Sequence, residues 1–214
     1  GDAWRVEASS ADDVAVAPYG PPLAADSGVT AVTVEWSPSS TAQPMMVRVV
    51  DRHVAWRRSI EQRFQGLGAG ATSYSHTYYG ATPWPMDGLL WMPLLHARGI
   101  GGYRSVDGAL TAVVPLPRCL ERQFASIVGV PSRGYLARTD GSLVAFSPRT
   151  AQLTWIIDFA SPAAVARRTD ASIQADLGDY CDVGDLSGAA LFATPALAED
   201  GTLFVGTGTG FLYA

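Results

Sequence analysis

Short apolar runs separated by turns make up most of the chain. Residues 29–36 (VTAVTVEW) alternate apolar and polar side chains, which is typical of a strand with one buried face. Residues 45–56 (MMVRVVDRHVAW) form a second strand-like segment after a connector rich in proline and serine. The best helical candidate, residues 58–68, has apolar residues at helical spacing, but it is short and ends in glycines. The pattern therefore predicts an all-β chain.

Glycine-bearing turns recur in front of short apolar strands. Asp107-Gly108, Asp140-Gly141 and Thr209-Gly210 each precede such a strand. The segments TPWPMDGLLWM (82–92) and TPALAEDGTLFV (194–205) also resemble each other, because both have Thr-Pro, then Asp-Gly, then an apolar strand. Self-similarity at a spacing of a few tens of residues indicates a repeat architecture.

The repeats have the pattern of β-propeller blades. In such a blade glycine turns join antiparallel strands, and successive sheets stack face to face around an axis. We therefore expect an all-β fold, a β-propeller built of four-stranded antiparallel blades. Since a blade takes about 40–45 residues, the chain holds at most about five, and we expect a partial ring or a fragment of a larger propeller.

Two regions differ in how clearly they show the repeat. Residues 1–80 are expected to form an N-terminal β-rich segment of divergent blades. Residues 81–214 are expected to hold the propeller repeats, with an insertion at about 160–193.

Residues 126–159 and 194–214 resemble the pyrroloquinoline-quinone-type (quinoprotein-like) β-propeller repeat. The matching residues are Asp140, Gly141, Leu143, Ala145, Thr150, Trp155, Thr194, Pro195, Gly201 and Gly210. The chain departs from the repeat at Ser147, where an aspartate is usual, and at Ala151, where a glycine is usual. The resemblance implies that the matching glycines form structural turns and that Trp155 packs between adjacent blades.

The composition narrows the possible chemistry. All 15 basic residues are arginine, so a P-loop lysine, a lysine Schiff base and a serine–lysine dyad are excluded. The absence of lysine is typical of a GC-rich bacterial coding bias. The net charge of −5 and the scattered arginines argue against nucleic-acid binding. No apolar run approaches the ~20 residues that span a bilayer and no signal-peptide pattern is present, so an exported protein is expected here in its mature form.

Two groups of residues are candidates for a covalent bond or a metal ion. Cys119 and Cys181 are too far apart for a CxxC motif, and we favour a single disulfide in an exported protein over two buried thiols. Asp179, Asp182 and Asp185 are candidates for a calcium site, since clustered carboxylates in a loop supply oxygen ligands. The alternative for these aspartates is a solvated acidic loop. The three histidines lie in no zinc-binding motif.

Aromatic residues concentrate between positions 73 and 91. Tyr78, Tyr79, Trp84 and Trp91 would stack on a sugar or on a partner surface if they were exposed. The alternative is that they pack between blades, as aromatic side chains of propellers commonly do.

The resemblance also bears on cofactors. Enzymes of the quinoprotein family hold pyrroloquinoline quinone (PQQ) with a calcium or lanthanide ion, using carboxylates and an asparagine, and often a disulfide of adjacent cysteines. This sequence has no asparagine and no Cys-Cys pair, so we expect no cofactor. The resemblance also includes many cofactor-free relatives, among them one whose propeller is a docking surface.

These observations predict a non-catalytic β-propeller that serves as a binding or assembly scaffold in the periplasm or outside the cell. It is expected to bind a protein partner, or the remainder of the same propeller, through loops at one end of the ring and through an edge strand. The first alternative is a fragment of a PQQ-dependent dehydrogenase with calcium. The second is a carbohydrate-binding propeller that uses the Tyr/Trp cluster.

Overall fold

The chain is all-β. The computed structural model describes residues 15–18, 23–25, 28–37, 40–51, 53–59, 82–94, 99–116, 125–138, 141–159, 193–208 and 210–214. Every regular element in these stretches is a strand, as the alternating and turn-rich sequence predicts.

The first sheet is formed by the N-terminal part of the chain. Its strands are β1 (Ala15–Pro18), β2 (Leu23–Ala25), β3 (Gly28–Ser37), β4 (Ser40–Val50) and β5 (His53–Ser59). They pair antiparallel in the order β1-β3-β4-β5, and β2 also pairs with β3. β3 covers the alternating segment 29–36, whereas segment 45–56 is divided between β4 and β5, which meet at a turn where Asp51 has a φ of 47°.

Two complete four-stranded sheets follow, which we call the first and second blades. The first blade comprises β6 (Trp84–Met86), β7 (Leu89–Leu94), β8 (Gly99–Arg104) and β9 (Leu110–Pro115). The second comprises β10 (Val128–Val130), β11 (Arg133–Ala137), β12 (Ser142–Ser147) and β13 (Gln152–Asp158). In both, consecutive strands are antiparallel neighbours.

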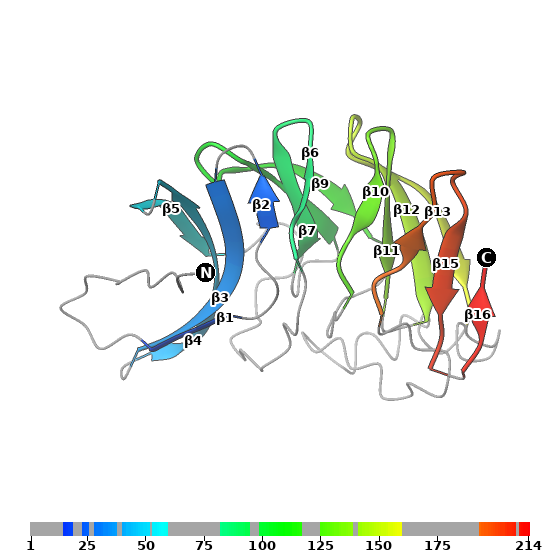
Figure 1. Ribbon diagram of the computed structural model, residues 1–214, viewed down its shortest axis with the longest axis horizontal. Coiled ribbons are helices and arrows are strands. Elements are labelled where there is room, and N and C mark those ends of the chain that lie inside the picture. The colour runs from blue at the N-terminus through cyan, green and yellow to red at the C-terminus, as the bar shows by residue number, and fades with distance from the viewer. Residues whose placement is uncertain are drawn as a thin grey trace, which may run out of the picture.

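The third blade has three described strands. These are β14 (Ala196–Leu197), β15 (Leu203–Gly206) and β16 (Leu212–Tyr213), again in chain order. The blades lie side by side in chain order (Figure 1), with β10 next to β14 and β9 next to β13. Stacked antiparallel sheets that follow one another along the chain are the architecture of a β-propeller, and the described sheets form part of a ring.

A shared apolar core joins the first and second blades. Trp91 of β7 is fully buried, and its ring centroid lies 5.3 Å from that of Phe146 on β12. The other buried members of this cluster are Met86, Ile100, Val114, Leu116, Ile127, Leu136 and Val144. A smaller cluster of Ala125, Ala137, Leu143 and Val205 joins the second and third blades, and Trp155 packs against it.

The turns in front of the strands use glycines with positive φ. Gly108, Gly141 and Gly210 have φ values of 69°, 79° and 86°, and Gly201, in the hairpin turn between β14 and β15, has a φ of 90°. L-residues with a Cβ rarely adopt this conformation, which accounts for the recurrence of glycine at these turns.

Several sequence predictions lie outside the described residues. The proposed boundary near residue 80 and the insertion 160–193, except for residue 193, are among them. Of the helical candidate 58–68, residues 58 and 59 belong to β5 and the rest is not described.

Candidate functional site

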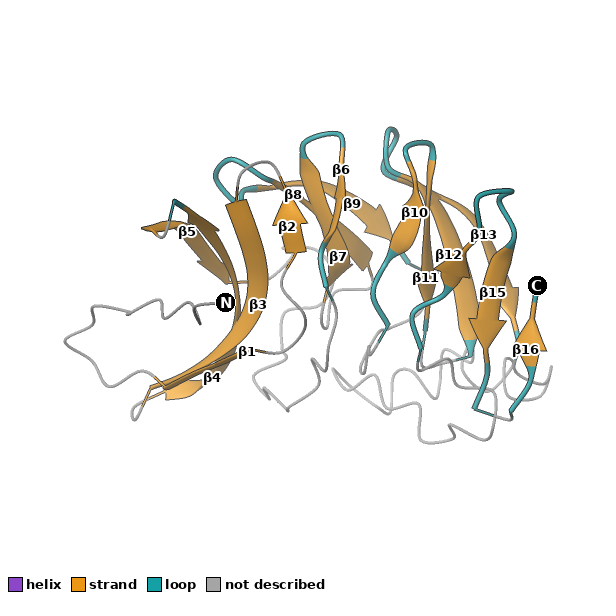
Figure 2. Cartoon of the chain, in the orientation of Figure 1, coloured by secondary structure: helices purple, strands orange, loops and turns teal. Residues whose placement is uncertain are grey.

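Hairpin turns lie along one edge of the row of sheets (Figure 2). They follow β6, β8, β10, β12 and β14. Two apolar side chains are exposed at or beside these turns, Val106 with 76% of its surface accessible and Val130 with 42%. The turns carry both arginines and acidic residues, so the charge along this edge is of mixed sign.

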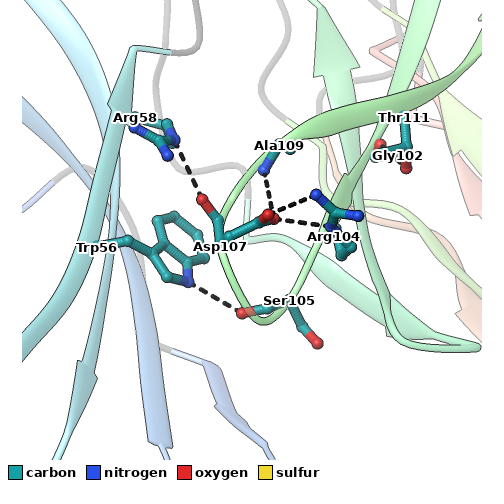
Figure 3. Close-up of polar contacts among 8 residues, drawn as sticks. All are labelled: Trp56, Arg58, Gly102, Arg104, Ser105, Asp107, Ala109 and Thr111. Carbon is teal, nitrogen blue, oxygen red and sulfur yellow. Dashed lines mark hydrogen bonds and ion pairs between the residues drawn. The ribbon is translucent and has the colours of Figure 1, made fainter.

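A polar contact joins the first sheet to the first blade. Figure 3 shows Trp56 and Arg58 of β5 reaching the turn between β8 and β9. The indole N–H of Trp56 donates to the carbonyl of Ser105 at 2.9 Å, and Nε of Arg58 donates to the carbonyl of Asp107 at 3.1 Å. A Cβ on Gly108 would lie 2.7 Å from Cε3 of Trp56, so glycine is needed there for the close approach as well as for the turn. This contact joins the first sheet to the first blade.

The Asp107 carboxylate holds the same turn in shape. Nε of Arg104 donates to Oδ1 of Asp107 at 2.9 Å, and the backbone N–H of Ala109 donates to the same oxygen at 3.0 Å. The hydrogen bond from Arg104, the backbone N–H of Ala109 and the charges of Arg104 and Arg58 together lower the pKa of Asp107. The ionised carboxylate is therefore the form that stabilises the turn.

A pH dependence of stability follows from this contact. Because the pKa of Asp107 is lower in the folded protein than its ordinary value of 3.8, the stabilisation is complete above about pH 4 and is lost as the pH falls through the folded pKa. Asp107→Asn should therefore be less stable than the native chain at neutral pH, and the difference should shrink below about pH 4. Urea denaturation at a series of pH values measures this, and a difference independent of pH would contradict it.

Backbone N–H groups and hydroxyls link the starts of successive blades. The N–H of Thr82 donates to Oγ of Ser126 at 2.7 Å, across 44 residues. The N–H of Ser126 donates in turn to Oγ1 of Thr194 at 2.8 Å, across 68 residues. Thr82, Ser126 and Thr194 occupy the same position in their blades. Each lies two residues before the first residue of the blade that pairs with the second strand, and these paired residues are Trp84, Val128 and Ala196. We call this series the inter-blade hydroxyl chain.

In each blade the second strand has an aromatic residue as the register partner of Trp84, Val128 or Ala196. The register pairs are Trp84 with Trp91, Val128 with Tyr135, and Ala196 with Phe204. Trp91 and Tyr135 are 0% and 9% exposed, whereas Phe204 is 37% exposed. The same structural position is thus covered in the first two blades and open in the third.

Large apolar side chains are exposed on the third blade. We call Phe204, Phe211, Leu212 and Tyr213 the third-blade apolar surface; 37%, 63%, 71% and 43% of their respective surfaces are accessible. No residue from 202 to 214 carries a charged side chain, so strands β15 and β16 place no charge beside these apolar residues.

The third-blade apolar surface has two sides. Val205 is buried against the second blade, and its register partner Tyr213 lies on the same side, with its ring 4.7 Å from that of Phe159. Leu212 pairs with Gly206, so alternation along the strands places Leu212 and Phe204 on the opposite side. Phe204 and Leu212 therefore face away from the second blade.

The structure separates the aromatic residues singled out in the sequence. Trp91 is fully buried between the blades, so its ring is not accessible to a sugar or a partner. Trp84 is half-buried and packs on the second blade, since a Cβ on Gly129 would lie 2.7 Å from its ring. Tyr78 and Tyr79 lie outside the described residues.

The other candidate site residues are not brought together by the structure. Asp179, Asp182, Asp185, Cys119 and Cys181 lie outside the described residues, so the calcium site and the disulfide stay predictions. Among the residues that are described, no group of three His, Cys, Asp or Glu side chains could hold a metal ion. No helix in the same stretches is long and apolar enough to cross a membrane.

The sequence predictions missed the inter-blade hydroxyl chain. A signal for it exists, because Thr82 and Thr194 open the two similar segments TPWP and TPAL. Ser126 lacks the following proline, and only the register of β10 with β11 shows that it holds the same position.

Comparison with known proteins gives likenesses of fold alone. No family model matches the sequence, and no curated protein matches it. Among solved structures, the chain is similar to BamB from Moraxella catarrhalis, with a TM-score of 0.47 and 10% identity over 92% of this chain and 62% of that one. It is also similar to apo AztD from Citrobacter koseri, with a TM-score of 0.40 and 9% identity over 83% of this chain and 38% of that one. The chain thus spans less than two thirds of either protein, and neither likeness carries an argument about function.

Proposed function

We propose that the chain is a non-catalytic β-propeller scaffold that binds a protein partner through its third blade. The exposure of Phe204 and Leu212, on the side of the third blade that faces away from the second blade, carries the proposal. Soluble proteins rarely leave contiguous large apolar side chains open to water, and such patches commonly mark protein–protein interfaces. Phe and Tyr rings supply much contact area for little loss of side-chain entropy, which suits them to binding.

The character of this surface favours a protein partner of apolar character. The segment 202–214 has no charged side chain, so a charged ligand such as a nucleic acid or a phosphate would find no counter-charge there. Backbone groups of the short strand β16 add a second mode of binding, in which an extended segment pairs with the strand. Both modes use the same part of the third blade.

The repeat type and the cellular compartment are proposed from the sequence resemblance. We propose that the repeats are of the quinoprotein-like type and that the protein works in the periplasm or outside the cell. The described residues contain no set of carboxylates that fits a calcium ion beside PQQ, so we derive no step through that cofactor. The scaffold function needs no such group.

Selection of displayed peptides against the full chain tests the proposed function. Peptides enriched on the native chain should bind Leu212→Asp at least about tenfold more weakly, because a charge placed in an apolar interface must be desolvated. Fluorescence anisotropy with the enriched peptides measures the affinities.

The matched control places the same charge on an exposed apolar position outside the third blade. Val106→Asp, on the turn between β8 and β9, should leave the affinities unchanged. If no peptide is enriched, or if both variants bind the enriched peptides as the native chain does, the third blade is not the binding surface.

A further inference from the structure

The side of the third blade that carries Phe204 and Leu212 faces away from the second blade, and we call it the outer face. It has counterparts of the features by which each earlier blade contacts the next one. This inference rests on the proposed function and names the kind of partner that the third blade fits. Three features carry it: a hydrogen-bond donor with no acceptor among the described residues, an aromatic ring that no described element covers, and a small side chain where a large one packs in the first blade.

The unused donor is the backbone N–H of Thr194. The equivalent N–H groups of Thr82 and Ser126 each donate to a hydroxyl at the start of the next blade. No residue of the described chain accepts a hydrogen bond from the N–H of Thr194, which lies exposed. Since the inter-blade hydroxyl chain runs in one direction, its next acceptor would be a Ser or Thr hydroxyl.

The uncovered ring is Phe204. Trp91, at the same position of the first blade, is fully buried by packing against Phe146 of the second blade. Phe204 and Leu212 point the same way from the third blade, and no described element covers them. An apolar sheet laid on this face would therefore bury Phe204 as the second blade buries Trp91.

The third feature is the size of the residue two positions after the Thr or Ser. In the first blade it is Trp84, which packs on Gly129 of the second blade, the residue three positions after Ser126. In the second blade the residue at this position is the smaller Val128. The residue of the third blade that corresponds to Gly129 is Leu197, three positions after Thr194. In the third blade it is Ala196, so the next sheet would need a large residue at this place to fill the space.

We propose that the outer face of the third blade docks a further β-blade of the same repeat type. That blade supplies a Ser or Thr hydroxyl to the N–H of Thr194 and places a large apolar residue, three positions later, over Ala196. Its strands cover Phe204 and Leu212. The chemistry of the partner is thus specified at three places.

A hairpin peptide provides the test. Residues 193–206 of this chain (ATPALAEDGTLFVG) have Thr194 at the hydroxyl position and Leu197 three positions later. The peptide, closed by a disulfide between added terminal cysteines so that the hairpin is preformed, is titrated into the ¹⁵N-labelled full chain. We expect saturable shifts confined to the outer face, with slower hydrogen exchange at the amide of Thr194.

Two single changes in the peptide separate the contributions. Thr194→Val in the peptide keeps the shape and removes the hydroxyl, so affinity should fall about five- to tenfold and the protection of the Thr194 amide should be lost. Leu197→Ala in the peptide should weaken binding without removing that protection.

The outcomes distinguish this inference from the proposed function. Absence of shifts up to the solubility of the peptide, or equal binding of the Thr194→Val peptide, overturns the blade-docking inference. If displayed peptides still bind the native chain and not Leu212→Asp, the scaffold function stands without it. Shifts centred on Phe211 and Tyr213 instead of Phe204 would also overturn it.

Discussion

Replacing Trp91 with alanine is expected to lower the free energy of unfolding by about 3–5 kcal/mol, the usual cost of removing a large aromatic ring from a core. Trp91 has no accessible surface, and its ring packs against Phe146 of the next blade. The cavity would therefore open between two blades, where relaxation of one sheet alone cannot fill it. Urea denaturation of the full chain measures the change.

A second substitution at the same position tests the cause. The Nε1 of Trp91 is buried without a hydrogen-bond partner in the described structure. Trp91→Phe keeps an aromatic ring and removes this unsatisfied donor, so we expect a loss below about 1.5 kcal/mol. A loss below about 1 kcal/mol for Trp91→Ala would mean that the ring does not join the blades.

Gly129→Ala is expected to cost about 3 kcal/mol, the upper end of the usual cost of overpacking. An added Cβ would lie 2.3 Å from the backbone carbonyl oxygen of Arg133 and 2.7 Å from the ring of Trp84. The carbonyl belongs to β11, so it cannot move without disturbing the pairing of β10 with β11. Thermal and urea unfolding both report this loss.

Gly206→Ala is the matched control for that substitution. Gly206 also lies in a strand, but an added Cβ would have no atom within 4 Å. We expect a change within about 1 kcal/mol, since only the conformational entropy of the unfolded chain is affected. Equal losses at the two positions would show that the strand, and not the contact between blades, is sensitive to the change.

The fold could be predicted from the sequence because its signals are local. Asp-Gly and Thr-Gly turns in front of apolar strands identify hairpins within a few residues. The segment 45–56 shows where this fails: Asp51 turns the chain with a positive φ but without glycine, so two strands read as one segment.

The binding surface could not be predicted in the same way. Trp91 and Phe204 are both aromatic residues of apolar strands, and they differ because a described sheet packs on Trp91 whereas none of the described sheets packs on Phe204. The hydroxyl chain leaves a sequence signal only in the Thr-Pro pairs at 82 and 194, and its hydrogen bonds could not be predicted because they join residues 44 and 68 positions apart. Such contacts depend on the packing of whole sheets.

The direction of the inter-blade hydroxyl chain has a consequence for folding during synthesis. Strand pairs within a blade close short loops at small entropic cost, but the apolar core is shared between blades, so a blade buries its face only when its neighbour is present. The donors, Thr82 and Ser126, precede their acceptors in the chain. During synthesis each of these donors is therefore made before its acceptor, so the hydrogen bond between two blades can form only once the later blade has emerged.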